Sequence, residues 1–408
     1  MRDGWKTEGP ALDELVLGTK DGRKGKRALA IVITSFQARE SLAEHLRRLS
    51  RQSRKDFDII AVYGEKDEFL ETPGWAGVLH VREKGRMGCA GANYIGQKIA
   101  LQEGYESVIL ADDDCMPVSD DLVEKLAGSP GDCAMPNAGY GRQEAVPGFI
   151  IHHYGILRRG VLEKAGLTYL PFGNGGEDLE LIDRIRKAGM NFSQADARVS
   201  HPAPAPMMLE GGGRLFHYQR GLLLYRLICR MRVSALRYIA YSLLSGLLMA
   251  CAGDRGRGVL VFRALWAGSG MRMFREEVSG PEKASPLPAE DGYERVEPEG
   301  GDAVAAIRML PSLPGLFGKR ILLCRTSRPH AVRDLAPLLM ARGSAIEHDG
   351  KAYAFGKERG LAHIAAGIIL ALFLVPLILP AALMLWARGI VCRELSGIDT
   401  AGYGVRGR

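Results

Sequence analysis

Apolar runs alternate with amphipathic segments between residues 28 and 136. Leu42, Leu46 and Leu49 are spaced to share one face of a helix. Such alternation predicts an α/β fold, a mainly parallel or mixed sheet flanked by helices. Ligands on these sheets bind beyond the carboxyl ends of the strands, so polar residues after each strand are the functional candidates. Strands are predicted by apolar runs, most of them rich in β-branched residues, at 28–34, 58–63, 78–81, 107–110 and 133–135.

The remainder of the chain divides by composition. A helix is predicted over 175–190, because acids lie in its first turn, basic residues in its last, and Gly189 at its end. The amino-terminal residues are polar, lack the apolar core of a secretory signal and end in a basic cluster, so we expect the α/β domain to stay in the cytoplasm. The predicted segments are a basic N-terminal arm at 1–27, the α/β domain at 28–205, a basic amphipathic helical region at 206–275, a linker at 276–305, a small βα element at 306–360 (strand 319–326, helix 331–343), a transmembrane or re-entrant segment at 361–390 and a tail at 391–408.

Two of these segments indicate a membrane. Residues 211–253 contain no acid but carry several arginines among apolar residues, which is typical of helices on an anionic bilayer surface. A helical subdomain with solvated or phosphate-binding arginines is an equal alternative. The run from Ile364 to Ala387 is uncharged over about 24 residues, long enough to span a bilayer. Pro376 and Pro380 predict a kink or a re-entrant shape in that run, and its basic flanks leave the orientation open.

Charge and cysteine content change this picture little. The net charge of +7 favours anionic partners such as nucleotide phosphates, anionic lipid or nucleic acid. The seven cysteines are scattered and never form C-x-x-C, which argues against a disulfide framework and against a cysteine zinc site. We therefore expect reduced cysteines that lie mostly in the core.

The strongest chemical signal is three adjacent aspartates, Asp112, Asp113 and Asp114, directly after the strand at 107–110. Adjacent carboxylates repel one another unless a cation or water offsets their charge. Mg²⁺ and Mn²⁺ prefer oxygen ligands and bridge carboxylates to a diphosphate. The alternative is a solvated acidic turn.

The order of the motifs is more specific than any single motif. The chain carries in succession AIVITSFQARESLAEHLRRLSRQ, FDIIAVYGEKDE, GRMGCAGANYIGQKIALQEG, VILADDDCMP, GILRRGVLEKAG, GGEDLELIDRIRKAG and RVSHP. Over residues 28–201 this succession resembles glycosyltransferase family 2, which has the GT-A fold. HYQRGLLLYR and FRALWAGSGMRMF resemble the carboxyl-terminal part of its rhamnosyltransferase-type members. The resemblance implies an inverting, metal-dependent glycosyltransferase in cell-envelope polysaccharide, glycolipid or glycoprotein assembly.

The resemblance also assigns the metal ligands. Asp112 and Asp114 become the pair that holds Mn²⁺ or Mg²⁺ on the donor diphosphate, and Asp113 supports the sugar or ribose. His201, which ends the strand-like ARVS, becomes a third metal or diphosphate ligand. Imidazole suits Mn²⁺ better than Mg²⁺. A surface or core histidine is the alternative for His201.

The catalytic base is expected at the start of the helix at 175–190. Glu177 and Asp178 occupy that position, and Asp178 is the better match to the family. A carboxylate there can take the proton of an acceptor hydroxyl as its oxygen attacks the anomeric carbon. The alternative is that both acids only offset the helix dipole.

Nucleotide binding is expected from residues after the first two strands. Thr34 and Ser35 follow the first strand and face the base and ribose in this interpretation. After the second strand, family members usually carry an acidic pair and then Gly-Ser, where this chain has Tyr63, Gly64, Glu65 and Lys66. Glu65 is the candidate to replace the acidic pair, and the nucleotide, whether UDP, dTDP or GDP, stays open.

A glycine-rich segment at 85–93 completes the predicted site. It lets the backbone approach a nucleotide before a helix begins, and Arg86, Gly88 and Asn93 are its candidate contacts. Close packing of the helix is the alternative. Arg220 is a candidate for binding donor phosphate or a lipid diphosphate, or else an interfacial or solvated arginine.

Other functions fit less well. A sugar-nucleotide nucleotidyltransferase needs a glycine-rich basic loop after the first strand, where this chain has TSFQARE. No G-x-G-x-x-G follows an early strand, which disfavours a dinucleotide oxidoreductase. A catalytically inactive, membrane-anchored scaffold stays possible from sequence. The expected partners are a nucleotide-sugar donor, a glycan or lipid-linked acceptor and the cytoplasmic membrane, with the catalytic domain on its cytoplasmic side and no nucleic acid.

Overall fold

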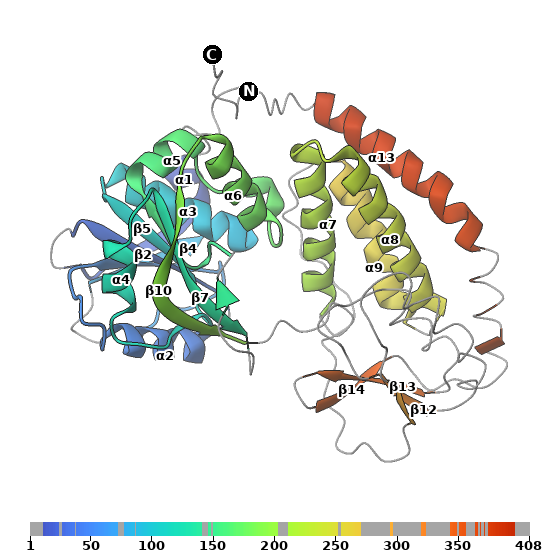
Figure 1. Cartoon of the computed structure of the whole chain (residues 1–408), viewed down its shortest axis with the longest axis horizontal. Coiled ribbons are helices and arrows are strands. Elements are labelled where there is room, and N and C mark those ends of the chain that lie inside the picture. The colour runs from blue at the N-terminus through green and yellow to red at the C-terminus, as the bar shows by residue number, and fades with distance from the viewer. Residues whose placement is uncertain are drawn as a thin grey trace. The chain divides into compact units, whose positions relative to one another are not determined.

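The chain folds into two compact units in the computed structural model (Figure 1). The first comprises Met1–Pro204 with Met273–Glu276 and Ser396–Arg408, and the second comprises Ala205–Arg272 with Glu277–Leu395. The structure describes residues 11–23, 27–36, 38–71, 77–85, 87–140, 146–147, 150–202, 211–251, 254–270, 294–296, 320–323, 343–348, 351–355, 364–365, 368, 371 and 374–395.

A ten-stranded mixed sheet forms the centre of the first unit, in the order β1-β4-β3-β2-β5-β9-β7-β10-β6 with β8 beside β7 (Figure 1). Its parallel part consists of β2 (Leu29–Ser35), β3 (Asp58–Tyr63), β4 (Val78–Glu83) and β5 (Ser107–Asp112). Every residue of β2 and β3 is buried, which explains their nearly continuous apolar sequences. All five predicted strands are present.

An antiparallel strand that the sequence pattern did not indicate, β9 (His153–Arg158), lies between β5 and β7 (Cys133–Tyr140). β10 (Phe192–His201) pairs in parallel with β7. The remaining short strands, β6 (Met116–Pro117) and β8 (Val146–Pro147), are antiparallel to β10 and β7. The sheet is therefore mixed, and β10 brings its carboxyl end to the same edge as β5.

Part of the predicted N-terminal arm belongs to the sheet. After the short helix α1 (Leu12–Leu15), β1 (Val16–Asp21) runs antiparallel to β4 at the edge of the sheet. Most of its residues are exposed, so the polar sequence carries no apolar alternation that would predict a strand.

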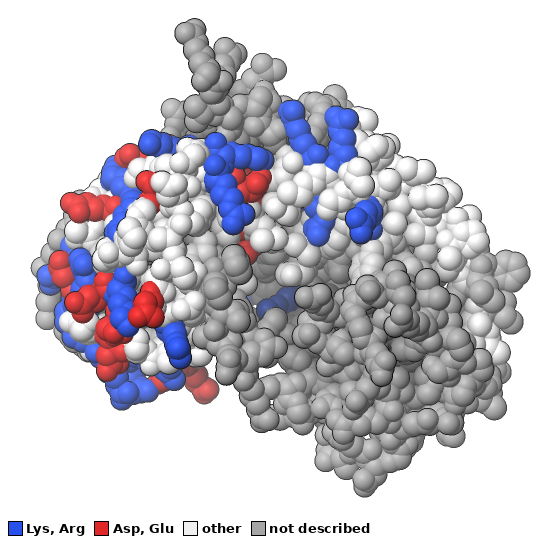
Figure 2. Space-filling view, in the orientation of Figure 1, with Lys and Arg blue, Asp and Glu red and all other residues white. Residues whose placement is uncertain are grey.

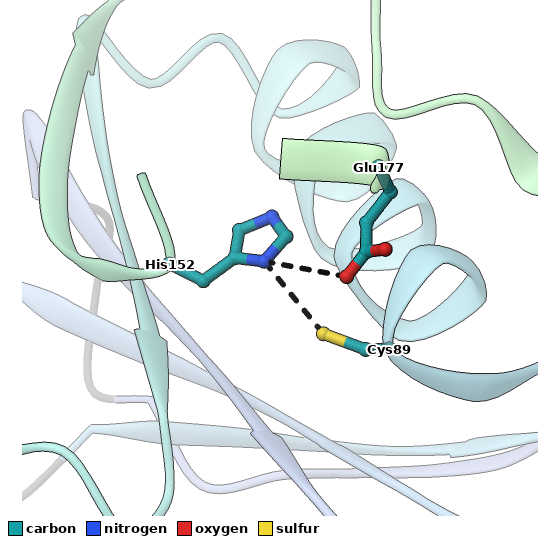
Figure 3. Close-up of side chains that lie close together, drawn as sticks. All are labelled: Cys89, His152 and Glu177. Carbon is teal, nitrogen blue, oxygen red and sulfur yellow. Dashed lines mark hydrogen bonds and ion pairs between the residues drawn. The ribbon is translucent and has the colours of Figure 1, made fainter. Parts of the chain in front are cut away.

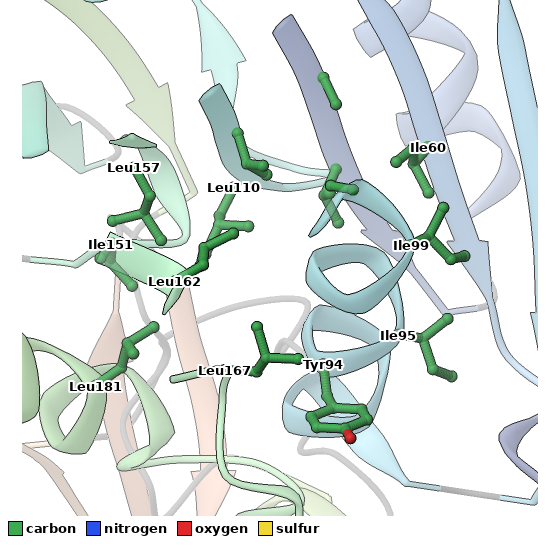
Figure 4. Close-up of a cluster of buried hydrophobic side chains, with 14 of the residues drawn as sticks. Ile60, Tyr94, Ile95, Ile99, Leu110, Ile151, Leu157, Leu162, Leu167 and Leu181 are labelled. Carbon is green, nitrogen blue, oxygen red and sulfur yellow. The ribbon is translucent and has the colours of Figure 1, made fainter. Parts of the chain in front are cut away.

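Helices cover both faces of this sheet. Leu42, Leu46 and Leu49 of α2 pack with Ile31 and Ile33, which confirms the predicted apolar helix face. The opposite face packs Val32 and Ile60 against Ile95 and Ile99 of α3 and against Leu162 and Leu181, as Figure 4 shows in part. The helices of this unit are α2 (Arg39–Leu49), α3 (Gly88–Gln102), α4 (Leu122–Gly128), α5 (Arg159–Ala165), the 3₁₀ turn η1 (Leu170–Phe172) and α6 (Glu177–Lys187).

The second unit contains three packed helices, α7 (Gly212–Ile228), α8 (Arg232–Cys251) and α9 (Arg255–Ser269), with a further helix, α13 (Ile378–Leu395), against them. The α8–α9 contact is close, since a Cβ on Gly258 would lie 2.6 Å from the Gly246 carbonyl oxygen. Trp386 Nε1 on α13 donates to the Arg232 carbonyl at 3.0 Å. A second sheet pairs β11 (Glu294–Val296), β12 (Arg320–Leu323), β13 (Gly343–His348) and β14 (Lys351–Phe355).

The second sheet tests the predictions for this region in part. β12 lies within the strand expected over 319–326, of which the structure describes 320–323, and the helix expected over 331–343 lies outside the described residues except for Gly343, where β13 begins. β11 falls within the predicted linker and pairs in parallel with β12, so residues 294–296 are part of the sheet. The short strand was missed because its neighbours are rich in Glu, Pro and Gly, the composition of a linker.

One described helix, α8, is long and apolar enough to cross a bilayer by length and composition, and half of its most apolar window is buried inside the protein. The predicted membrane segment, Ile364 to Ala387, is described only in part. It contains the 3₁₀ turn η4 (Val375–Leu377) at Pro376, and Pro380 then lies in the first turn of α13, where a missing N–H costs little. The helical geometry thus changes from a 3₁₀ turn to an α-helix just after Pro376, near the position where a kink is predicted. Insertion of this segment into a membrane stays a prediction.

Candidate functional site

The aspartate triplet lies at the carboxyl end of β5, beside the end of β2. Thr34 and Asp112 are register partners on these two strands, and Thr34 Oγ1 donates to Asp112 Oδ1 at 3.1 Å. The hydroxyl of Ser35 donates to Asp113. Thr34 and Ser35 are both buried. Their hydroxyl groups therefore hold the carboxylates in place, and their predicted contacts with base and ribose stay a prediction.

Two histidines from neighbouring strands meet the triplet. His201 Nε2, at the end of β10, lies 3.2 Å from Asp114 Oδ1. His153, at the start of β9, stacks on His201 with ring centroids 4.4 Å apart, and its Nε2 is 3.9 Å from Asp112 Oδ2. Asp112, His153 and His201 offer ligand atoms that all lie within 4.8 Å of one another. Three strands thus bring one carboxylate and two imidazoles to a position that suits a divalent cation.

The tautomer of His201 is set by its neighbour. His201 Nδ1 lies 2.6 Å from the Pro202 carbonyl oxygen, so Nδ1 carries a proton and donates it there. In the neutral ring Nε2 then has only a lone pair, which faces the Asp114 carboxylate. Either a proton or a cation is needed between them. A backbone acceptor of this kind is how many metal-binding histidines are oriented.

Burial controls the protonation of the triplet. It raises the pKa of Asp112 to about 7, with Asp114 adding to the shift. Burial also raises the pKa of Asp113 to about 6. Burial acts on Asp114 in the same direction, but the hydrogen bond and the charge of His201, together with the charge of His153 and a backbone hydrogen bond, outweigh burial and lower the Asp114 pKa. Without a counter-charge Asp112 and Asp113 therefore bind protons at a higher pH than ordinary aspartates, and a bound cation would favour their ionised forms.

The second acidic element opens α6. Gly173, Gly175 and Gly176 precede it with φ of +69°, +85° and +91°, a backbone conformation that favours glycine. Glu177 is only 5% exposed, and Asp178 is half-buried. Burial raises the pKa of both carboxyl groups, and Asp178 raises that of Glu177 further. Asp178 is the more accessible of the two acids.

Cys89 and His152 connect the two acidic elements (Figure 3). Cys89 Sγ lies 3.8 Å from Asp112 Oδ1 and 3.7 Å from His152 Nδ1. His152 Nδ1 lies 3.9 Å from Glu177 Oε1. The aspartate triplet and the start of α6 therefore meet in one site.

Three residues of the site, Cys89, His152 and His153, are not predicted from the sequence. The two histidines lie at the amino end of β9, which the apolar pattern does not predict, and Cys89 is one of the cysteines expected to lie mostly in the core. A pair of adjacent histidines followed by the apolar run YGIL was the signal that a search for a further strand would have used.

The glycine-rich segment packs against protein. Gly88, at the start of α3, has φ +68°, and a Cβ there would lie 2.6 Å from Asn174 Oδ1. A Cβ on Gly96 would lie 2.3 Å from Val32. Asn93 is completely buried and donates to the Cys89 carbonyl at 3.0 Å. Gly88 thus packs closely against Asn174, and Asn93 holds the Cys89 backbone, whereas nucleotide contacts of Gly88 and Asn93 stay a prediction.

The other predicted contacts are less defined. Arg86 lies outside the described residues. Glu65 is half-buried in the turn after β3. Arg220 lies on α7 in the second unit and is completely buried. Their roles stay predictions. Five cysteines with described side chains form no disulfide with one another: Cys89, Cys115, Cys133, Cys229 and Cys251.

Comparisons with known proteins give only distant likenesses. No protein-family profile matches the chain. No curated protein matches it either.

Among solved structures, S. aureus TarS is 11% identical over 49% of this chain and 39% of TarS, with a TM-score of 0.34. The mannosyltransferase PcManGT from Pyrobaculum calidifontis, in complex with GDP-Man and Mn²⁺, is 14% identical over 62% of this chain and 77% of its own, with a TM-score of 0.38. HddC from Yersinia pseudotuberculosis is 14% identical over 43% of this chain and 90% of HddC, with a TM-score of 0.28. The match spans well under half of the length of TarS, and none of the three is similar enough to assign a function to this chain.

Proposed function

We propose that the chain is an inverting, metal-dependent glycosyltransferase that moves a sugar from a nucleotide diphosphate donor to an acceptor hydroxyl. One observation carries the proposal: the aspartate triplet after β5 and the acids at the start of α6 converge on one site through Cys89 and His152. A donor held at the first element then has its anomeric carbon within reach of the second. The mixed α/β sheet agrees with the fold that the family 2 resemblance implies.

Asp112, Asp114 and His201, together with His153, are the residues that would hold the divalent cation. They fit such an ion, because His201 Nε2 faces the Asp114 carboxylate at 3.2 Å, where a proton or a cation is needed, and the carboxylates lie close together. Their oxygen and imidazole ligands suit Mn²⁺. When bound, the ion would offset the charge that develops on the departing diphosphate.

Asp178 is the proposed base. It accepts the proton of the acceptor hydroxyl while the acceptor oxygen forms a bond to the anomeric carbon. The bond from that carbon to the diphosphate oxygen breaks on the opposite face, and the electron pair leaves with the diphosphate. One displacement inverts the configuration. A raised pKa makes Asp178 a better proton acceptor than an exposed aspartate.

We propose further that the second unit contacts an anionic bilayer. Its exposed apolar side chains include Trp266 on α9 and Leu379 and Met384 on α13, which are 54%, 59% and 58% exposed. Arg226, Arg230 and Arg232 line one small cavity with Trp386 and Ile390. On the face drawn in Figure 2, acidic and basic side chains mix over the first unit, whereas the described residues of the second unit that face the viewer are basic or uncharged. Apolar and basic groups together suit a membrane with acidic lipid.

Donor profiling tests the proposed reaction. The full-length protein is incubated with UDP-, dTDP- and GDP-sugars, in Mn²⁺, in Mg²⁺ and in chelator, and release of nucleoside diphosphate is measured. We expect metal-dependent release from one donor class. Release of pyrophosphate from a nucleoside triphosphate and a sugar phosphate would instead identify a nucleotidyltransferase. Binding of a donor without turnover, with or without a lipid-linked acceptor, would favour an inactive scaffold.

Flotation with lipid vesicles tests the bilayer contact. We expect the protein to float with vesicles that contain phosphatidylglycerol and to bind phosphatidylcholine vesicles less. Replacing Leu379 and Met384 by Ser should reduce flotation. Equal flotation of this variant would contradict a contact through α13.

A further inference from the structure

A second group of potential metal ligands lies beside the aspartate triplet. Cys89 comes from the first turn of α3, His152 from the turn before β9, and Glu177 from the first residue of α6 (Figure 3). Their Sγ, Nδ1 and Oε1 atoms all lie within 4.8 Å of one another. Three segments far apart in sequence thus direct a sulfur, a nitrogen and an oxygen at one point.

The spacing of these atoms is close to that of a tetrahedral zinc site. Zinc binds cysteine sulfur at about 2.3 Å and histidine nitrogen or carboxylate oxygen at about 2.0–2.2 Å, which places tetrahedral ligands about 3.3–3.6 Å apart. The Sγ–Nδ1 distance is 3.7 Å, and the Nδ1–Oε1 distance is 3.9 Å. Small side-chain movements therefore bring all three onto one ion.

The protein itself leaves part of this group unsatisfied. His152 is 2% exposed and Glu177 is 5% exposed. His152 Nε2 and Glu177 Oε2 are buried and have no hydrogen-bond partner among the described residues. The separation of 3.9 Å between His152 and Glu177 is too long for a hydrogen bond. A buried carboxylate without a counter-charge is costly, and a cation bound at Glu177 Oε1 and His152 Nδ1 would offset its charge.

The chemistry of these ligands differs from that of the neighbouring site. Thiolate and imidazole favour Zn²⁺ over Mg²⁺ or Mn²⁺, whereas the aspartate triplet offers mainly oxygen. We propose that Cys89, His152 and Glu177 bind Zn²⁺ at a second site, distinct from that of the ion held by Asp112, Asp114 and His201. Binding would release the proton of the Cys89 thiol to solvent and leave a fourth coordination position open.

Zinc bound at this second site should inhibit sugar transfer, and this consequence rests on the proposed function. Zinc at this point takes up Glu177 next to the proposed base, and it lies close to Asp112, whose Oδ1 is 3.8 Å from Cys89 Sγ. Metal binding itself requires no sugar transfer, so the two proposals can fail separately.

Cobalt substitution tests the site in the full-length protein. Cobalt bound to a thiolate gives an intense charge-transfer absorption in the near ultraviolet, which oxygen ligands do not give. We expect that band at one equivalent of Co²⁺ and its loss when Zn²⁺ is added. Cys89→Ser should abolish the band and weaken Zn²⁺ binding by about 100-fold, and His152→Ala should weaken it by at least about 10-fold. Zinc affinity is measured by competition with a chromophoric chelator.

Two variants serve as controls. Cys229→Ser removes another half-buried thiol, at the end of α7, and should leave the band unchanged. His201→Ala removes a ligand of the other site and should also keep the band. Circular dichroism checks that each variant is folded, and Zn²⁺ should raise the melting temperature of the unmodified protein but not of His152→Ala. A missing band in the unmodified protein, or a band that persists in Cys89→Ser, would overturn the proposal. If the band is present and no donor is turned over, only the proposed function fails.

Discussion

Thr34 on β2 donates a hydrogen bond to Asp112 on β5, at 3.1 Å between Oγ1 and Oδ1. The two residues are register partners on adjacent parallel strands, so the sheet itself sets their separation. The contact fixes one carboxylate oxygen and leaves the other directed toward His153. The pairing of β2 with β5 thus positions Asp112, the proposed metal ligand.

Loss of this hydroxyl should weaken metal binding. A hydrogen bond to a charged group contributes about 1.5–3 kcal/mol, so Thr34→Val should reduce Mn²⁺ affinity about 10- to 100-fold. Thr34→Ser keeps a hydroxyl and should retain most of the affinity. Isothermal titration with Mn²⁺ measures both variants. Equal affinities in Val and Ser variants would show that the hydroxyl does not position Asp112.

Asp114→Asn should impair binding of the donor. The substitution removes a proposed ligand and the negative charge that His201 faces at 3.2 Å. We expect metal-dependent donor affinity to fall by at least about 10-fold, with the weak metal-independent binding unchanged. Equilibrium binding of the donor with Mn²⁺ and with chelator measures this. Unchanged affinity in Mn²⁺ would exclude Asp114 as a ligand.

Asp178→Asn should impair transfer and spare binding. An amide cannot accept the acceptor's proton, so the transfer rate should fall about 10²- to 10⁴-fold while donor affinity stays within a few-fold. Glu177→Gln is the matched control at the adjacent, more buried position, and it should retain more activity. Transfer at the unmodified rate in Asp178→Asn would show that the base is another residue.

Gly88→Ala should destabilise the first unit. Alanine is strained at φ +68°, and its Cβ would lie 2.6 Å from Asn174 Oδ1. A loss of about 1–3 kcal/mol is expected from strain of this kind. Gly160 on α5 has nothing within 4 Å of its Cβ position, so Gly160→Ala should be neutral or stabilise by up to about 1 kcal/mol. Denaturant unfolding compares the two, and equal effects would contradict the steric explanation.

His45 should make the first unit sensitive to acid. It is completely buried, its Nδ1 donates to the Asp113 carbonyl and its Nε2 accepts from the Tyr154 hydroxyl. Burial lowers its pKa from 6.5 to about 4. Because the unfolded chain binds the proton first, the stability that neutral His45 supports is complete above pH 6.5 and is lost as pH falls toward 4.

The size of this loss is about 3 kcal/mol, from a shift of about 2.5 pKa units at 1.36 kcal/mol each. His45→Gln keeps a neutral polar side chain and should be less sensitive between pH 6.5 and 4. The free energy of unfolding against pH measures both proteins. If the free energy of unfolding falls with pH equally steeply in both proteins, the acid sensitivity comes from other buried histidines.

The parallel half of the sheet was predictable because its strands are buried on both faces. Burial forces apolar residues into every position of β2 and β3, and the amphipathic α2 between them repeats with helical spacing. The edge strand β1 carries no such pattern, since it is largely exposed. β9 is also buried, but its first residue is His153 of the candidate site and His152 precedes it. The sequence at the start of β9 is therefore not a continuous apolar run.

The candidate site was predictable where residues of one kind lie together in sequence. The aspartates and the acids of α6 are such groups. Cys89 and His152 stand alone in the sequence and meet only because α3 and the turn before β9 lie side by side in the fold. Chemistry that arises from such a long-range contact leaves no local pattern to detect.

The position of His201 at the end of β10 affects the order of events during synthesis. Asp114 emerges from the ribosome well before the imidazole that faces it. Until β10 adds to the sheet beside β7, the acidic turn lacks this partner, whereas His153 lies on β9, which comes earlier in the chain and pairs with β5. We therefore expect a nascent chain that stops before β10 to lack one ligand of the proposed cation site, so full ion affinity should develop only after β10 has paired with β7.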